Sequence, residues 1–269
     1  MKRIVLYLVV LLSLFFVLQP LTAEAKNEQP DFIASDVEAL IGQARWGDGQ
    51  ACVELAKCYQ EGIGVEQDFL STTLRLIQAR DFGAIDDLDS YLAEALEGSN
   101  FKLTIDGFFK IDEQPEVALL ISEQMIANGL FDGYTIQGLI AMEQGDTLKG
   151  IELTERAADQ GSSFAEVLLC FPSWRETSEP DIDRLKTLAD KRPVCYLLLA
   201  NGYTDSASGN MKNDSLAAYY FIKADQYGFL GRKDAHWLLQ YYENGGDVQL
   251  TEEDVRRLQK LAGNKKDMN

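Results

Sequence analysis

The chain has 269 residues, of which 25 are basic and 43 acidic, and its formal net charge at pH 7 is -18. Such a surface repels phosphate backbones and anionic lipid headgroups, so the charge argues against nucleic acid and peripheral membrane partners. A basic protein or peptide remains possible as a partner, and the alternative is that the charge serves solubility alone. The length suits one or two ordinary domains, or one elongated array.

Residues 1–25 have the order of a secretory signal peptide. Two basic residues precede an apolar stretch over residues 4–18, and an Ala-Glu-Ala sequence ends at Ala25. We expect cleavage between Ala25 and Lys26, which leaves 23 basic and 42 acidic residues. The alternative is an uncleaved membrane anchor, but the apolar stretch is shorter than the roughly 20 residues that a spanning helix needs.

No later segment of the sequence is long and apolar enough to span a membrane. We therefore expect an exported protein in the periplasm or cell envelope of a bacterium, or a secreted one, with eukaryotic secretion as the alternative. Residues 26–34 are predicted to be a flexible leader, residues 35–262 a helical repeat array and residues 263–269 a disordered tail.

Helical periodicity runs through the whole predicted array, in segments of about 10 to 15 residues separated by Gly, Asp, Asn or Pro. The first helix, over residues 35–45, is expected to act as an N-terminal cap. Six helix pairs follow it, over roughly residues 50–80, 84–128, 132–160, 163–191, 194–227 and 231–262.

A repeated spacing supports this partition. An Asp or Asn is followed by an Ala eleven residues later and by a Gly fifteen residues later, and this occurs three times. The polar residue caps a helix start, the Ala allows close approach of a neighbouring helix, and the Gly ends the helix in the left-handed conformation. The three sets are Asp68, Ala79 and Gly83; Asp146, Ala157 and Gly161; and Asn213, Ala224 and Gly228.

A second spacing, with intervals of four, four and three residues, precedes the first and predicts an apolar stripe along the first helix of a pair. The full set is Ala51, Leu55, Tyr59 and Gly62, repeated near the C-terminus with Asp234, Leu238, Tyr242 and Gly245. Partial sets are Cys195, Leu199 and Tyr203, and Ala165 with Leu169.

These residues resemble the Sel-one-like repeat family, a relative of the tetratricopeptide repeat. The clearest match is residues 51–83, which departs from the family at Thr72, while residues 84–129 are the most divergent. The family positions matched there are Ala51, Leu55, Ala56, Tyr59, Gly62, Gly64, Val65, Asp68, Ala79 and Gly83. The resemblance implies an all-α fold, a right-handed α-solenoid of about six antiparallel helix pairs. In such an array each pair packs only against its neighbours.

The same resemblance implies protein–protein interaction without catalysis. The first helix of each pair is expected to line a concave groove that binds a peptide or a partner domain. Side chains expected to face this groove are Lys57, Glu61, Asn201 and Thr204. The chain is thus predicted to be a scaffold or adaptor rather than an enzyme.

Aromatic residues are dense near the C-terminal end, where they form a candidate partner patch with core packing as the alternative. They are Tyr219, Tyr220, Phe221, Tyr227, Phe229, Trp237, Tyr241 and Tyr242.

Four cysteines follow the apolar stretch: Cys52, Cys58, Cys170 and Cys195. Four cysteines allow three disulfide connectivities. Cys52 and Cys58 point about 240° apart on one predicted helix, so they cannot pair there. Cys170 and Cys195 are the better candidates, and buried thiols are the alternative.

No catalytic residue, cofactor-binding residue or metal ligand is predicted. The single histidine, His236, is interpreted as structural, Gly62-Ile63-Gly64 as a turn, and the acidic residues 86–89 as the first turn of a helix. The alternative function is a cell-wall hydrolase or an enzyme that interacts with β-lactams. Its motif would be Ser99-x-x-Lys102 with residues 208–210, but the Lys-Thr-Gly element is missing from the sequence.

Overall fold

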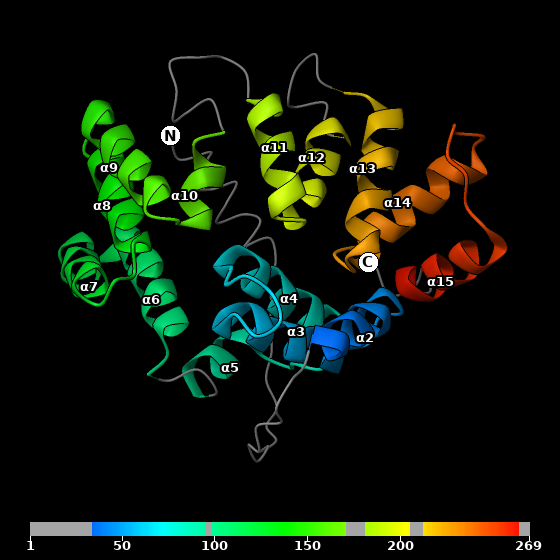
Figure 1. Cartoon of the computed structure of the whole chain (residues 1–269), viewed down its shortest axis with the longest axis horizontal. Coiled ribbons are helices and arrows are strands. Elements are labelled where there is room, and N and C mark those ends of the chain that lie inside the picture. The colour runs from blue at the N-terminus through cyan, green and yellow to red at the C-terminus, as the bar shows by residue number, and fades with distance from the viewer. Residues whose placement is uncertain (1–33, 95–97, 171–180, 205–211, 264–269) are drawn as a thin grey trace. The chain divides into compact units, whose positions relative to one another are not determined.

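The computed structural model describes residues 34–94, 98–170, 181–204 and 212–263. Within these ranges every regular element is an α-helix (Figure 1). The helices are α2 (Ala34–Arg45), α3 (Gly49–Glu61), α4 (Phe69–Asp81), α5 (Leu88–Glu94), α6 (Asn100–Glu113), α7 (Pro115–Ala127), α8 (Asp132–Glu143), α9 (Thr147–Asp159), α10 (Ser163–Leu168), α11 (Ile182–Lys191), α12 (Val194–Thr204), α13 (Asp214–Gln226), α14 (Arg232–Glu243) and α15 (Glu252–Ala262).

The prediction of an all-α chain of paired helices is confirmed. Five of the six predicted pairs pack as pairs, namely α3/α4, α6/α7, α8/α9, α12/α13 and α14/α15. The fourth predicted pair, α10/α11, is not among them, since α10 packs against α9 and α11 against α12. The divergent region holds one helix more than predicted, the short α5. The predicted signal peptide, its cleavage site, nearly all of the leader, the tail beyond Gly263 and the 208–210 motif lie outside the described residues.

The repeated residues do what their spacing predicts. Each of the three polar residues is a helix N-cap: the side chains of Asp68, Asp146 and Asn213 accept hydrogen bonds from the backbone N–H groups of Leu70, Lys149 and Leu216. The three alanines eleven residues on are fully buried. The three glycines that follow have φ of 82°, 94° and 72°, a conformation that a side chain disfavours. Capping and helix termination are therefore encoded locally, within a few residues of each helix end.

The loop between the helices of a pair also repeats. The backbone N–H of Asp68 donates to the carbonyl of Tyr59 at 2.9 Å, and that of Asn213 donates to the carbonyl of Tyr203 at 3.0 Å. In the sequence the second connection is one residue longer than the first, and its residues 205–211 lie outside the described residues. Gly62 ends α3 with φ of 73°, so the Gly62-Ile63-Gly64 sequence is a turn, as expected.

The chain divides into two compact units. The first contains residues 89–181, and its described core is built from α6 to α10 around Met125, Ile136 and Leu168. The second combines two stretches of sequence, Asn27–Leu88 and Ile182–Asn269. The boundary passes through the predicted fourth pair, since α10 belongs to the first unit and α11 to the second.

In the first unit, α8 and α9 approach each other very closely at two glycines. A Cβ added at Gly138 would lie 2.8 Å from the carbonyl oxygen of Gly150, and one added at Gly150 would lie 3.0 Å from that of Gly138. Because one obstacle in each case is backbone, neither contact can relax by a side-chain rotation. The two glycines therefore set the distance between these helices.

We expect Gly138→Ala to lower the free energy of unfolding by about 1–3 kcal/mol, since an added methyl group must displace packed backbone. Gly202→Ala is the control, because Gly202 lies within α12 and a Cβ there would meet nothing within 4 Å. That substitution should be neutral or stabilise by up to about 1 kcal/mol, the helix-propensity difference. Urea unfolding followed by circular dichroism measures both, and equal effects would contradict the close-approach argument.

The second unit joins the two ends of the array. Arg45 at the end of α2 contacts Asp225 of α13, and Lys260 of α15 lies 5.4 Å from the centre of the Trp46 ring. Arg75 of α4 donates to the backbone carbonyls of Tyr227 and Gly228, which follow α13. The expectation that each pair packs only against its sequence neighbours is therefore wrong for the first pair. Likewise α2 contacts C-terminal helices as well as α3, rather than serving only as an end cap.

Candidate binding surfaces

Five tyrosines lie on α12, on α13 and at the residue that follows α13, and the two helices pack side by side as a pair (Figure 1). We call this group the tyrosine strip; its members are Tyr196, Tyr203, Tyr219, Tyr220 and Tyr227. Tyr203 and Tyr220 are buried, Tyr196 is half-buried, and Tyr219 and Tyr227 are 52% and 37% exposed. The strip thus has a buried floor and exposed edges.

Stacking holds these rings in a fixed arrangement. Tyr203 and Tyr220 have ring centres 5.8 Å apart and planes within 4° of parallel. Tyr196 stacks against both Tyr220 and Tyr227, with centres 6.3 Å apart in each case. Tyr219 meets Tyr220 edge to face at 5.0 Å. Stacked pairs of this kind add to the stability that burial alone provides.

Charged residues border the strip. The Tyr196 hydroxyl donates to the exposed Asp190 at 2.8 Å. Burial, followed by the neighbouring Asp190 carboxylate, raises the pKa of Tyr196 to about 12, and burial also raises the pKa of Tyr220. Both phenols therefore stay protonated at neutral pH, and the Tyr196 hydroxyl keeps its hydrogen bond to Asp190. Lys186 of α11 pairs with Asp183 at 3.5 Å.

Other aromatic residues of the predicted patch have different environments. Phe221 and Phe229 are fully buried, so the core alternative is right for these two. Trp237 stacks on Tyr241 at 5.4 Å, and both are half-buried. The sequence could not separate these residues from the exposed Tyr219 and Tyr227, because aromatic residues serve cores and interfaces alike.

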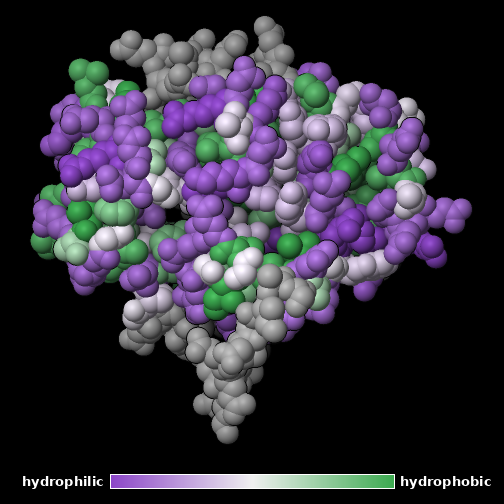
Figure 2. Space-filling model, viewed as in Figure 1, coloured by the Kyte–Doolittle hydropathy of each residue, from purple (hydrophilic) through white to green (hydrophobic). Residues whose placement is uncertain are grey.

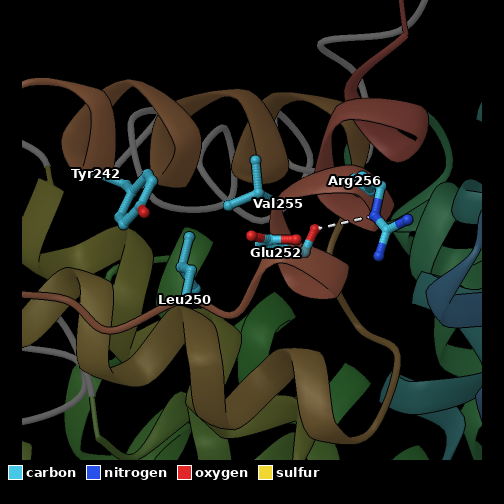
Figure 3. Close-up of a pocket in the computed structure, with 5 residues that line it drawn as sticks. All are labelled: Tyr242, Leu250, Glu252, Val255 and Arg256. Atoms are coloured by element: carbon cyan, nitrogen blue, oxygen red, sulfur yellow. Dashed lines mark hydrogen bonds between the residues drawn. The ribbon is translucent and has the colours of Figure 1, made fainter.

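A shallow pocket of about 360 Å³ lies where α14 ends and α15 begins. Its lining is Tyr242, Leu250, Glu252, Val255 and Arg256 (Figure 3). Tyr242 occupies the repeat position at which Tyr59 and Tyr203 are buried, but here the ring is 36% exposed. The nitrogen Nε of Arg256 donates to the carbonyl of Glu252 at 3.3 Å.

The four residues predicted to line a groove all lie in the second unit. Lys57 is half-buried and pairs with Glu54 at 3.4 Å, while Glu61 is exposed at the end of α3. Asn201 and Thr204 are half-buried on α12, where the Thr204 hydroxyl donates to the Asn201 carbonyl at 2.8 Å. Along a helix of 100° per residue these two lie roughly 80° to 160° from the Tyr196–Tyr203 stripe. Their role in binding remains a prediction.

Hydrophilic residues cover most of the face in Figure 2, and hydrophobic residues gather in places, among them over α7. The exposed large apolar side chains of the first unit, in the part that the structure describes, are Phe109, Val117, Leu119, Leu120 and Leu148. The second unit adds Trp46, Leu216, Tyr219, Tyr227 and Tyr242.

The candidate catalytic pair has local structural roles. Ser99 is the N-cap of α6, and its hydroxyl accepts a hydrogen bond from the backbone N–H of Lys102 at 3.1 Å. The Lys102 amine pairs with Asp106 at 2.6 Å. His236 is half-buried on α14. Among the described residues no group of three His, Cys, Asp or Glu side chains is placed to hold a metal ion, and none of the helices there is long and apolar enough to cross a membrane.

All four cysteines are buried. Cys52 and Cys58 are free thiols, as their different directions on one helix predict. Burial raises the pKa of Cys52 to about 11, so this thiol stays protonated and unreactive at neutral pH. Cys170 lies in the first unit and Cys195 in the second, and a disulfide between them stays a prediction.

Asp234 begins the last copy of the second repeat spacing, and it is a titratable group with a shifted pKa. Its carboxylate accepts a hydrogen bond from the backbone N–H of Gly231 at 2.9 Å, at the start of α14. Burial nevertheless raises the pKa of Asp234 to about 6, and the Gly231 hydrogen bond offsets only part of that effect.

The folded state therefore binds a proton at Asp234 more tightly than the unfolded state, so ionisation of this carboxyl destabilises the fold. The wild-type free energy of unfolding should rise, relative to that of Asp234→Asn, as the pH falls from 7 through 6 toward 4. Urea unfolding of both proteins over this range measures it. A difference that does not change between pH 7 and 5 would contradict the raised pKa.

Among known proteins, this chain is similar only to solved structures, and that similarity is one of backbone fold. No protein-family model matches the chain, and no curated protein matches it. A Sel1 repeat protein from Oxalobacter formigenes superposes with a TM-score of 0.44 at 18% identity, over 94% of this chain and 96% of that one. A protective antigen of uropathogenic Escherichia coli with an SLR fold gives a TM-score of 0.39 at 18% identity, over 85% of this chain. The match spans 55% of the length of that antigen. In its repeated caps, glycines and buried alanines, the chain resembles Sel1-like repeat proteins.

Proposed function

We propose that the chain is a non-catalytic, protein-binding repeat protein that is exported to the bacterial cell envelope. The observation that carries this proposal is the tyrosine strip, in which exposed Tyr219 and Tyr227 stand beside a rigid stacked floor. Tyrosine is enriched at the centres of protein interfaces because its ring offers a large contact area and its hydroxyl a hydrogen bond.

The arrangement of the strip favours binding over chemistry. Its rings are held by stacking, so little side-chain entropy is lost when a partner docks. The acidic balance of the chain favours a basic partner, since like charges would slow association. Export rests on the signal-peptide pattern of residues 1–25.

Site-specific photo-crosslinking tests the binding. A photoreactive phenylalanine analogue replaces Tyr219 in one strain and Gln259, an exposed residue of α15, in a control strain. A discrete adduct from position 219 that is absent at position 259 is the expected result. Equal adducts, or none from position 219, would overturn the proposed site.

Export has a separate test. Cell fractionation followed by mass spectrometry of the intact protein should find the chain in the periplasmic or envelope fraction with Lys26 as its first residue. A chain that retains residues 1–25 and stays in the cytoplasm would contradict export without bearing on the strip.

A further inference from the structure

Helix α7 carries apolar side chains on both of its faces. On one face Ala118 and Met125 are buried, where α7 packs against α6 and α8. On the other face Leu120 is 65% exposed, and Leu119 and Val117 are 40% and 38% exposed (Figure 2). A helix at a protein surface is normally polar toward water, and one that is apolar all round is normally covered. The described residues leave this second face of α7 open, which suits a surface that a partner covers.

Acidic side chains surround the exposed leucines. Glu116 lies one turn before Leu120 and Glu123 lies about one turn after it, and both glutamates are exposed. At 100° per residue, each glutamate is within about 60° of Leu120 around the helix. The sequence over residues 111–148 holds seven acidic residues and no Lys or Arg.

The helices that pack against α7 offer it no unpaired basic side chain. On α6, Lys102 pairs with Asp106 at 2.6 Å and Lys110 pairs with Glu113 at 4.0 Å. Helix α8 contains no Lys or Arg. The open face of α7 is therefore apolar and acidic. A second copy of the chain would bring glutamates against glutamates there, whereas a basic partner would be attracted.

The backbone of α7 favours a helical occupant over an extended one. The amide and carbonyl groups of a helix interior are bonded within the helix, so an extended peptide lying on α7 would find no backbone partners. A helical partner satisfies its own backbone and contributes only side chains. Its complement to Leu120 and the two glutamates is an apolar side chain with a basic residue about one turn away on each side.

We propose that the open face of α7 binds a basic amphipathic helix of a partner protein, in which an apolar stripe is flanked by Lys or Arg seven residues apart. This is the spacing of Glu116 and Glu123, which is roughly 10.5 Å along the helix axis. Apolar side chains of the partner cover Leu119 and Leu120, and its basic side chains pair with the glutamates. The inference goes beyond the proposed function, because this surface belongs to the first unit and the tyrosine strip to the second.

Fluorescence anisotropy with synthetic peptides tests the proposal on the purified chain. The first probe is a labelled peptide of about 18 residues, long enough to form a helix, with leucines on one face and lysines seven residues apart beside them. The second probe has the same residues in an order that gives no apolar stripe, and the third has glutamate in place of each lysine. We expect the first probe to bind at least tenfold more tightly than either of the others. Equal binding of the first two probes would overturn the amphipathic helix, and equal binding of the first and third would overturn the charge argument.

Two leucines of the first unit locate the site. Leu120→Gln removes the most exposed apolar side chain of α7 and should weaken binding of the first probe at least fivefold. Leu148→Gln is the matched control, because Leu148 is 77% exposed on α9. This control should change the affinity less than twofold. Both side chains are exposed, so neither substitution should alter the circular dichroism spectrum. Equal effects of the two substitutions would show that the probe does not bind at α7.

The glutamates have their own test, which leaves the leucines in place. Glu116→Gln combined with Glu123→Gln should weaken binding of the first probe at least fivefold. Glu152→Gln combined with Glu155→Gln makes the same change of net charge at exposed positions of α9 and should change the affinity less than twofold. If both pairs of substitutions weaken binding alike, the probe responds only to the net charge of the chain, and the proposal is overturned.

A second copy of the chain is the other candidate occupant of this face. Sedimentation equilibrium should find the wild type and Leu120→Gln in the same oligomeric state. A wild-type dimer that Leu120→Gln converts to a monomer would overturn the proposal in favour of self-association. Crosslinking from position 219 decides the proposed function separately. An adduct there, with no binding of the first probe, would leave protein binding at the tyrosine strip standing and rule out the site on α7.

Discussion

Replacement of Arg75 by alanine is expected to lower the free energy of unfolding by about 3–5 kcal/mol, the range for loss of a large buried side chain or one partner of a buried pair. Arg75 is fully buried and donates to the carbonyls of Tyr227 and Gly228 and to the side chain of Gln78. Its guanidinium also lies 3.9 Å from the centre of the Phe229 ring. The substitution leaves a cavity and a backbone carbonyl without its donor.

Urea unfolding measures this loss, with Arg256→Ala as the control. Arg256 is exposed and makes one long hydrogen bond to its own helix, so its removal should change the free energy by no more than about 0.5 kcal/mol. Hydrogen exchange gives a second readout: amides of α4 and of residues 227–230 should lose protection together in Arg75→Ala. If the two arginine variants behave alike, Arg75 does not join the first pair to the C-terminal helices.

Arg75→Lys distinguishes charge from geometry. Lysine keeps the positive charge but lacks the planar fork that reaches two carbonyls at once. We therefore expect Arg75→Lys to recover only part of the lost free energy. Full recovery would show that charge alone is needed.

The second large effect is expected at Asp225, whose carboxylate accepts hydrogen bonds from Arg257 at 2.8 and 2.6 Å and from Arg45 at 2.9 Å. The side chains of Arg257 and Asp225 are only 5% and 8% exposed. Asp225→Leu should therefore cost about 3–5 kcal/mol, because it leaves the Arg257 charge buried without this carboxylate. Arg257→Met should be costly for the converse reason.

A double-mutant cycle tests this pair. A protein with both Asp225→Leu and Arg257→Met loses the two members of this buried pair together, so its loss should be much smaller than the sum of the two single losses. Each free energy comes from urea unfolding at the same pH and salt concentration. Additive losses would show that the two side chains stabilise the fold independently.

The caps, glycines and buried alanines could be predicted because each depends on residues close in the sequence. Asp68 caps the helix that starts at the next residue, Ala79 lies in the last turn of that helix, and Gly83 follows its end. Spacing therefore carries most of the information about where helices begin, end and pair. The repeat spacing is less informative where it is interrupted. Residues 84–129 are such a region, and the extra helix α5 occurs there, before α6.

The candidate binding residues could be predicted only in part. The sequence pointed to aromatic residues near the C-terminal end, and Tyr219 and Tyr227 are among them. The aromatic patch predicted from the sequence did not include Tyr196 and Tyr203, which complete the strip from α12. The sequence predicts Tyr203 as a buried repeat position, which is confirmed, and its ring also stacks on that of Tyr220. Whether a ring is core or surface depends on the helix packed against it.

By itself the sequence determined the class of the fold, the ends of most helices and their order in pairs, since these follow from capping and periodicity within about fifteen residues. Only the tertiary structure decided that the first and last helices join in one unit. Arg75 meets Gly228 across 153 residues, and Arg45 meets Asp225 across 180. A buried arginine gives no local signal, because its partners are backbone carbonyls and a carboxylate that only folding brings near.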